Sequence, residues 1–300
     1  MTSQLVGPLR LCCLLFVTCA AFTARADAGA GAVEWRPEWR RVNLFEGLAL
    51  IPAGGLLWAI ETQWKPPSEP NWRGGIGADD LARELLRGET RELQRTAAKF
   101  SDVLFIGGVV APILIDVGVV ALGIHRKPDL AWQMFLIDLQ SLFVAGLVSL
   151  SAEHGVGRTR PFVEDCGEDG VVRDDEGRTF QRCGSSSETK SFFSGHASAT
   201  ATVAGLTCIH HQHLPLYGGG FADLAPCLFT IAVSASTGMG RIIADRHWTS
   251  DVLLGWSVGA LSGYILPALI HYGWSDTGLQ VTPLATFGGA LGLNVTGKLD

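Results

Sequence analysis

The chain carries three clusters of polar and charged residues, and each cluster lies at one end of an apolar stretch. Residues 153–161 read EHGVGRTRP, residues 194–196 read SGH, and residues 241–251 read RIIADRHWTSD. Arginine and histidine suit phosphoryl chemistry, because a tetrahedral oxyanion prefers forked, permanently charged donors. The clusters therefore direct attention to a site for phosphate.

Four residues could bind the phosphoryl oxygens. Arg160 and Arg241 could supply guanidinium donors. Ser194 and Gly195 open an apolar segment, so they are expected at a helix N-terminus, where unpaired N–H groups and the helix dipole favour an anion. The glycine lets the backbone approach closely.

Two histidines could share the catalytic work. His247 and Asp251 are four residues apart, so on a helix they would share one face. Asp251 could then hold one imidazole nitrogen and leave the other free to attack phosphorus. His196 could protonate the leaving oxygen.

In this order, the clusters resemble the signature of the type-2 phosphatidic acid phosphatase superfamily, which includes bacterial class A acid phosphatases and vanadium haloperoxidases. That signature is Lys, six residues, Arg-Pro; then Pro-Ser-Gly-His; then Ser-Arg, five residues, His, three residues, Asp. The matching residues are Arg160-Pro161, Ser194-Gly195-His196, and Arg241 with His247 and Asp251. The resemblance covers roughly residues 100–272.

The resemblance implies a role for each matching residue. His247 would be the phosphohistidine nucleophile with Asp251 as its partner, and His196 would be the general acid and then the base for water. The phosphoryl oxygens would be held by Arg160, Arg241, Ser194 and Gly195. No metal and no other cofactor is expected. The implied fold is all-α, a membrane bundle of about six helices with the active site at the helix ends on one membrane face.

Three positions depart from the signature. Glu153 stands where the lysine is expected and reverses a charge near the phosphate, whereas Phe193 and Gly240 are mild replacements for the proline and the serine. For Glu153 several interpretations stay open. It could be a solvated loop residue, Arg158 or His154 could compensate for it, phosphate affinity could be reduced, or the protein could be catalytically inactive.

The composition favours a membrane protein. Hydrophobic residues make up 47% of the 300 residues and charged residues 17%, against about 25% charged in an average soluble domain. Residues 103–124, 131–152 and 252–270 are long enough to cross a bilayer, which takes about 20 apolar residues. Residues 224–240 are uncharged but shorter. The net charge of −6 argues against binding to nucleic acid.

Two further apolar segments are less clear. Residues 197–209 are rich in Ala and Thr, which is typical of a helix packed inside a bundle. Residues 44–60 contain Glu46 and Pro52, so their crossing of the bilayer is uncertain.

The rest of the chain is expected to serve as a leader, a connection and a tail. The apolar run after Arg10 and the small residues of Ala24-Arg25-Ala26 indicate an export signal. A polar-faced helix is expected over 79–100, lying either on anionic headgroups or in solvent. The expected division is a signal peptide at 1–26, an N-terminal region with one marginal apolar segment at 27–101, the phosphatase-like domain at 102–273 and a tail with strand-like alternation at 274–300.

Export gives the cysteines a structural meaning. Cys166 and Cys183 could close a polar loop, residues 162–193, in an oxidising compartment. That loop would be either a headgroup selector or a solvated insertion. Cys208 and Cys227 lie in apolar stretches and are interpreted as small core residues.

Buried ionisable residues leave two questions open. His210, His211 and His213 could form a metal site, but without a carboxylate nearby in the sequence an interfacial polar cap is favoured. Asp116 and Asp138 lie inside apolar spans, where they would be either functional or paired within the bundle.

The positive loop His125-Arg126-Lys127 lies opposite the site and favours a cytoplasmic location for that end. The cysteine pair of the polar loop favours an outward location for the site. We therefore expect a multi-pass protein of the inner or plasma membrane with its site on the extracytoplasmic face, and residues 44–60 re-entrant or packed on the bundle. If the signal is cleaved and residues 44–60 span the bilayer, the site would instead face the cytoplasm.

The expected function is hydrolysis of a lipid phosphomonoester or pyrophosphate, of the class of phosphatidic acid, phosphatidylglycerol phosphate or undecaprenyl pyrophosphate. Its partners would be the lipid substrate and the bilayer. Two alternatives are a vanadate-dependent haloperoxidase, whose known relatives are soluble, and an inactive lipid-binding membrane protein.

Overall fold

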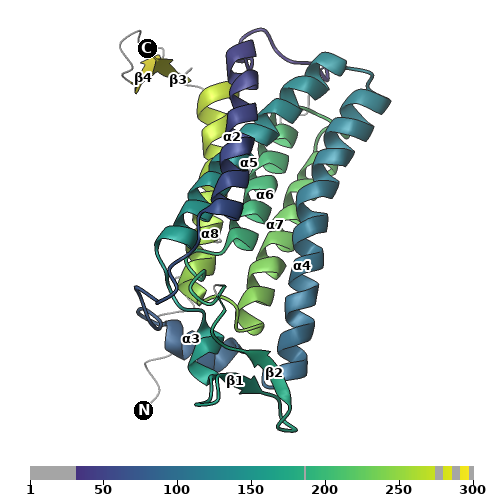
Figure 1. Cartoon of the computed structure of the whole chain (residues 1–300). Coiled ribbons are helices and arrows are strands. Elements are labelled where there is room, and N and C mark those ends of the chain that lie inside the picture. The colour runs from purple at the N-terminus through teal and green to yellow at the C-terminus, as the bar shows by residue number, and fades with distance from the viewer. Residues whose placement is uncertain (1–31, 186, 274–279, 286–290, 297–300) are drawn as a thin grey trace, which may run out of the picture.

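The computed structural model describes residues 32–185, 187–273, 280–285 and 291–296, so the expected signal peptide lies outside the described residues. Long helices run side by side, and the connections gather at the two ends of the bundle (Figure 1). In chain order the long helices are α2 (Leu44–Gln63), α4 (Arg91–Ile113) continued by η1 (Leu114–Ile124), α5 (Pro128–Gly155), α6 (Gly195–His213), α7 (Phe221–Ile243), and α8 (Thr249–Ala260) followed by η3 (Leu261–Ile265) and η4 (Ala268–Tyr272). The expected all-α helical bundle is confirmed.

The described helices have the properties of membrane spans. Five segments are long and apolar enough to cross a bilayer: Leu44–Gln63, Arg91–Ile124, Pro128–Gly155, Phe221–Ile243 and Thr249–Tyr272. Large apolar side chains such as Phe45, Ile51, Val103 and Ile106 are exposed on the outer faces of α2 and α4. The hydrocarbon core of a bilayer can cover such side chains, whereas soluble proteins rarely expose so large an apolar surface to water. The protein is therefore a multi-pass membrane protein.

The marginal segment 44–60 forms one continuous helix, α2. Asn43 caps its start, because the Asn43 side chain accepts a hydrogen bond from the Glu46 backbone and the Glu46 side chain accepts one from the Asn43 backbone. The helix then runs along α5. The re-entrant alternative is therefore wrong, and the segment that packs along α5 is also long and apolar enough to cross the bilayer.

The single polar helix expected over 79–100 is also wrong. The chain forms α3 (Asp79–Leu86), breaks near Gly88, and starts α4 at Arg91 with Thr90 as the N-cap. α4 then continues directly into the apolar span. Arg83 of α3 bonds to Asp245, and Arg87, which follows the helix, bonds to Asp165. Neither lipid headgroups nor solvent alone therefore explains these two arginines.

α6 is the central helix, and it contacts α4, α5, α7 and α8. Its small residues allow this close packing. Three glycines of α8 and η3 lie so near the α6 backbone that an added Cβ atom would collide with it. The facing pairs are Gly255 with Ser194, Gly259 with Ser198, and Gly263 with Thr202.

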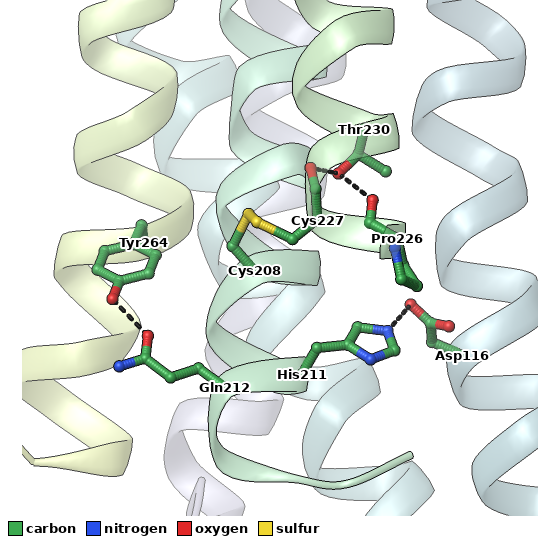
Figure 2. Close-up of a disulfide and its surroundings, with 8 residues drawn as sticks. All are labelled: Asp116, Cys208, His211, Gln212, Pro226, Cys227, Thr230 and Tyr264. Carbon is green, nitrogen blue, oxygen red and sulfur yellow. Dashed lines mark hydrogen bonds and ion pairs between the residues drawn. A yellow bond between two sulfur atoms is a disulfide. The ribbon is translucent and has the colours of Figure 1, made fainter. Parts of the chain in front are cut away.

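At the end opposite the polar clusters, buried histidines pair with carboxylates of neighbouring helices. His210 Nε2 lies 3.0 Å from Asp138 Oδ1. His211 lies between Asp223, 2.6 Å from its Nδ1, and Asp116, 3.3 Å from its Nε2, and Figure 2 shows its side chain reaching Asp116. For His210 and His211 the interfacial polar cap is therefore wrong, since both rings are buried and each bonds to an acid on another helix. His213 is half-buried, and its Nδ1 bonds to the Ile209 carbonyl of its own helix. Asp116 and Asp138 are paired within the bundle.

The four cysteines of the described residues form two disulfides. Cys166 and Cys183 close the polar loop, with their Cα atoms 6.4 Å apart. Cys208 on α6 and Cys227 on α7 are also joined (Figure 2), with their Cα atoms 4.5 Å apart. The interpretation of Cys208 and Cys227 as separate core residues is wrong, because α6 and α7 are adjacent helices connected by a short loop that brings the two thiols together.

Small strands complete the described chain. The polar loop contains η2 (Pro161–Asp165) and the antiparallel hairpin of β1 (Val171–Arg173) and β2 (Thr179–Arg182). In the tail, β3 (Gln280–Ala285) pairs antiparallel with β4 (Leu291–Thr296). The β1–β2 hairpin lies at the same end of the bundle as α3 (Figure 1).

Candidate active site

The three polar clusters meet at the end of the bundle that carries α3 and the β1–β2 hairpin (Figure 1). The first cluster follows α5, the second opens α6, and the third forms the turn between α7 and α8. Because α5 to α8 alternate in direction, two helix ends and two helix starts meet there. The bundle therefore brings together residues that are far apart in the sequence.

His247 is buried and fixed by its backbone surroundings. Its Nδ1 lies 2.8 Å from the Ser191 carbonyl oxygen, which accepts only if Nδ1 carries the proton. The neutral tautomer therefore has its lone pair on Nε2. Burial, followed by the positive charges of Arg160 and Arg241, lowers the pKa of His247 well below its ordinary value, so the ring stays neutral around pH 7.

Asp251 does not hold His247 directly, so the expected contact between them is wrong. α8 begins at Thr249, and His247 therefore precedes the helix and does not share its face with Asp251. The Asp251 carboxylate instead accepts from the Ser191 hydroxyl at 2.7 Å and from the Trp248 backbone at 3.2 Å. Asp251 thus acts on His247 through Ser191, whose carbonyl holds the ring.

Arg158 links this network to α3. Its guanidinium is fully buried and bonds to Asp251 at 2.6 Å and to Asp79 at 2.7 Å. It also lies over the rings of Trp72 and Trp248, 4.2 Å and 5.3 Å from their centres. Because both Arg158 carboxylate contacts are internal, Arg158 is not available to compensate for a missing lysine.

His196 faces α4 at the start of α6. Its Nε2 lies 3.0 Å from Asp102 Oδ1, and its ring packs 4.3 Å from the centre of the Phe105 ring. Asp102 also accepts from Arg241 Nη1 at 2.9 Å. One carboxylate of α4 therefore joins two residues that sequence analysis assigned to the site.

Arg241 and Arg160 place positive charges in a part of the site that is shielded from water. Arg241 is buried in the last turn of α7, and its Nε is buried without a hydrogen-bond partner. Arg160 donates to the backbone carbonyls of Ser187 at 2.8 Å and Arg246 at 3.3 Å. Burial lowers the pKa of Arg160 to about 10, which leaves it charged at neutral pH. Unsatisfied donors of this kind suit an anion.

Ser194 and Gly195 form the expected helix start. The Ser194 hydroxyl caps α6 by accepting from Ala197 N at 3.4 Å. The Gly195 N–H donates to Glu153 Oε1 at 3.1 Å. Glu153 is therefore neither a solvated loop residue nor neutralised by His154, whose Nδ1 bonds to a backbone carbonyl of its own helix.

Three of the seven predicted residues thus bond to two carboxylates. Glu153 occupies the Gly195 N–H, and Asp102 occupies His196 and Arg241. Their oxygens contact donors that the resemblance assigns to a phosphoryl group. Sequence reasoning missed Asp102, although an acidic residue at the border of an apolar span was a usable signal.

Sequence reasoning also missed Ser191 and Asp79. Ser191 fixes His247 through its carbonyl and Asp251 through its hydroxyl. Asp79 accepts from Ser250 and Arg158 and thereby attaches α3 to the start of α8. Neither residue is marked in the sequence, since both act through contacts between distant segments.

Comparisons with known proteins agree with the positions of the clusters. A model of the PAP2 superfamily matches residues 135–275. The solved structures include the first transmembrane PAP2 type phosphatidylglycerolphosphate phosphatase from Bacillus subtilis, which is 17% identical over 75% of this chain and 96% of that chain, with a TM-score of 0.43. No curated protein matches the chain.

Proposed function

Residues 135–275 carry the PAP2 superfamily pattern, and from this premise we propose that the protein is a membrane phosphatase that removes phosphate from a lipid through a phosphohistidine. One observation carries the proposal. A neutral histidine, His247, is anchored at Nδ1 and subject to the positive charges of Arg160 and Arg241. This is the arrangement that a nitrogen nucleophile needs to attack an anionic phosphorus centre.

In the first step, the Nε2 lone pair of His247 forms a bond to phosphorus, and the bond from phosphorus to the lipid oxygen breaks. Arg160, Arg241 and the Gly195 N–H hold the phosphoryl oxygens and balance the charge that develops on them. His196 gives a proton to the leaving lipid oxygen. The phosphate must take these donors from Asp102 and Glu153, which now accept from them.

In the second step, water attacks phosphorus and the phosphorus–nitrogen bond breaks. His196 accepts a proton from that water, which restores its protonated form for the next cycle. Asp102, 3.0 Å from His196 Nε2, stabilises that protonated ring. Asp251 is a positioning residue, because it orders Ser191, which fixes the His247 ring.

The position of the site in the bundle supports a lipid substrate. On α4, the exposed Asp102 is followed by the exposed apolar residues Val103 and Ile106. The border between headgroups and hydrocarbon therefore falls close to His196. A lipid in the bilayer would keep its chains against α4 while its phosphate enters the site, which fits phosphatidic acid, phosphatidylglycerol phosphate and undecaprenyl pyrophosphate.

The test is release of inorganic phosphate from a panel of lipid phosphates in detergent micelles. We expect release by the parent protein and none above background by His247→Ala. We also expect an acid-labile phosphoprotein in the parent quenched during turnover and none in His247→Ala, because only His247 forms the phosphorus–nitrogen bond. The control is Arg73→Ala, whose exposed side chain pairs with Glu69 and which should match the parent.

Three results would contradict the proposal. A folded parent that binds lipid phosphates without releasing phosphate would indicate the inactive lipid-binding alternative. Vanadate-dependent bromination would indicate the haloperoxidase alternative. Undiminished release by His247→Ala would exclude His247 as the nucleophile.

We further propose that the site faces the extracytoplasmic side. Support comes from the Cys166–Cys183 disulfide at the site end and from Arg126 and Lys127 at the opposite end. The four cysteines of the described residues are paired, so single introduced cysteines can be labelled in intact cells once Cys12, Cys13 and Cys19 are replaced by serine. Glu176→Cys in the hairpin should react with a membrane-impermeant maleimide, and Arg126→Cys should not. The reverse pattern would place the site in the cytoplasm.

A further inference from the structure

A second pocket lies beside the proposed phosphate site and has no role in the mechanism above. It has a volume of about 310 Å³ and lies between the first turns of α4, strand β2 and the turn before α8. Its lining includes Arg95, Lys99, Asp102, Phe180 and Arg246. The pocket wall on α4 lies outside the segment that matches the PAP2 superfamily.

The pocket carries positive charge that the protein does not neutralise. Within the described residues, Arg95, Lys99 and Arg246 take part in no ion pair. The arginines nearby behave differently, because Arg83 and Arg91 both bind Asp165. Three unpaired cations against the single carboxylate of Asp102 make the pocket attractive to an anion.

The pocket is also structured to present these charges. The Arg95 guanidinium lies 4.9 Å from the centre of the Phe180 ring, and the Arg246 guanidinium lies 5.4 Å from that of Phe162. Such contacts hold a cation in place without neutralising it. Phe180 belongs to the disulfide-closed hairpin loop, so this loop supplies one wall of the pocket.

Two residues connect the pocket to the phosphate site. Asp102 lines the pocket and also contacts His196 and Arg241. Arg246 lines it, precedes His247 in the chain, and accepts a hydrogen bond from Arg160 through its carbonyl. An anion in the pocket would therefore lie next to the phosphate that is transferred.

The depth of the pocket matches lipid headgroups. Its residues on α4 precede Val103, and from Val103 to its end at Ile113 that helix contains no charged residue. A charged group of a bilayer lipid can reach this level without leaving the interface. A pocket for a soluble ligand would not need to place its positive charges at the level of the lipid headgroups.

We propose that this pocket binds a second phosphate group of the substrate. The preferred substrate would then be a lipid whose headgroup carries another phosphate beside the one removed, either as a diphosphate or as a neighbouring phosphodiester. This inference rests on the proposed phosphatase function. It assigns Arg95, Lys99 and Arg246 to substrate selection and makes the hairpin loop part of a headgroup selector.

The test compares pairs of substrates, one with and one without the second phosphate. Farnesyl diphosphate is compared with farnesyl monophosphate, and phosphatidylglycerol phosphate with phosphatidic acid of the same acyl chains. The variants are the parent, Arg95→Gln with Lys99→Gln, and Arg178→Gln. Arg178 is the matched control, because it lies near the same hairpin but is paired with Asp174 and Glu176.

We expect the double variant to lower kcat/KM for the substrates with two phosphates about 10- to 100-fold, mainly through KM, since each lost charged contact weakens binding about tenfold. The substrates with one phosphate should change less than about threefold. The diphosphate pair and the phosphodiester pair separate the two possible sources of the second phosphate. An equal loss on both members of each pair, or no loss, would overturn the inference.

A binding measurement keeps this test separate from the proposed function. In His247→Ala, inorganic diphosphate should raise the unfolding temperature more than inorganic phosphate does, and Arg95→Gln with Lys99→Gln should abolish that difference. If the parent releases no phosphate but this preference is present, the phosphatase proposal fails and the pocket stands. If release is observed without this preference, the pocket fails and the phosphatase stands.

Discussion

Replacing Arg158 by methionine should destabilise the protein strongly although the residue is not assigned to bind phosphate. Its buried guanidinium contacts Asp79 at 2.7 Å and Asp251 at 2.6 Å. Methionine of similar length would leave both carboxylates buried without their cation. Removing one partner of a buried ion pair costs about 3–5 kcal/mol.

Other contacts set the size of the effect within that range. Asp79 keeps two hydrogen bonds from Ser250, and Asp251 keeps the one from Ser191. These contacts soften the loss, whereas the missing bonds from Arg158 to the Gly74 carbonyl add to it. We therefore expect a loss of about 4 kcal/mol in the free energy of unfolding, which corresponds to a decrease of about 8–16 °C in Tm.

The assay is thermal unfolding in detergent micelles, with phosphate release measured well below both transitions. Arg73→Met is the matched control, because its side chain is 71% exposed and pairs only with Glu69 at 3.7 Å, and such a pair contributes under about 1 kcal/mol. Arg158→Met should also lower kcat more than it raises KM, since Ser191 and His247 lose their support. A Tm within about 2 °C of the Arg73→Met value would refute the reasoning.

Three further outcomes are expected. Burial and the adjacent arginines lower the pKa of His247 below its ordinary value of 6.5. The acidic limb of the kcat/KM profile, where the nucleophile becomes protonated, should therefore lie below pH 6.5. Arg160→Gln removes one of the positive charges and should move this limb to higher pH. Burial raises the pKa of Asp165, but three neighbouring arginines lower it by more, so the net pKa lies below the ordinary 3.8. The stability that Asp165 contributes is therefore present above pH 3.8 and is lost as the pH falls through the lowered pKa. Asp165→Asn should remove this part of the acid transition in an unfolding titration. Gly259→Ala should cost about 1–3 kcal/mol in an unfolding assay through overpacking, whereas Gly118→Ala, where an added Cβ meets nothing within 4 Å, should be nearly neutral.

The membrane spans and the three clusters could be predicted because their signals are local. Apolar length indicates a span without knowledge of its neighbours, and the spacing of Arg241, His247 and Asp251 is continuous in the sequence. The same locality explains the errors. The face shared by His247 and Asp251 was assumed from helical spacing, but the helix begins two residues after His247.

Contacts between distant segments could not be predicted in this way. Asp79 and Arg158 are 79 positions apart, and His196 and Asp102 are 94 apart. The sequence contains both members of each pair but not the distance between them. The buried histidines of α6 show the same limitation, because the carboxylates that neutralise His210 and His211 belong to α5, η1 and α7.

The glycines between α6 and α8 limit where the chain can gain or lose residues. They recur every four residues and face backbone positions of α6 with the same repeat, so the two helices fit together at one register. Deleting a single residue between Gly255 and Gly259 would rotate the following part of the helix by about 100° and turn larger side chains toward α6. Substitutions in this stretch can be conservative, but insertions and deletions there should be excluded among functional relatives, whereas the β1–β2 hairpin can vary in length without disturbing the bundle.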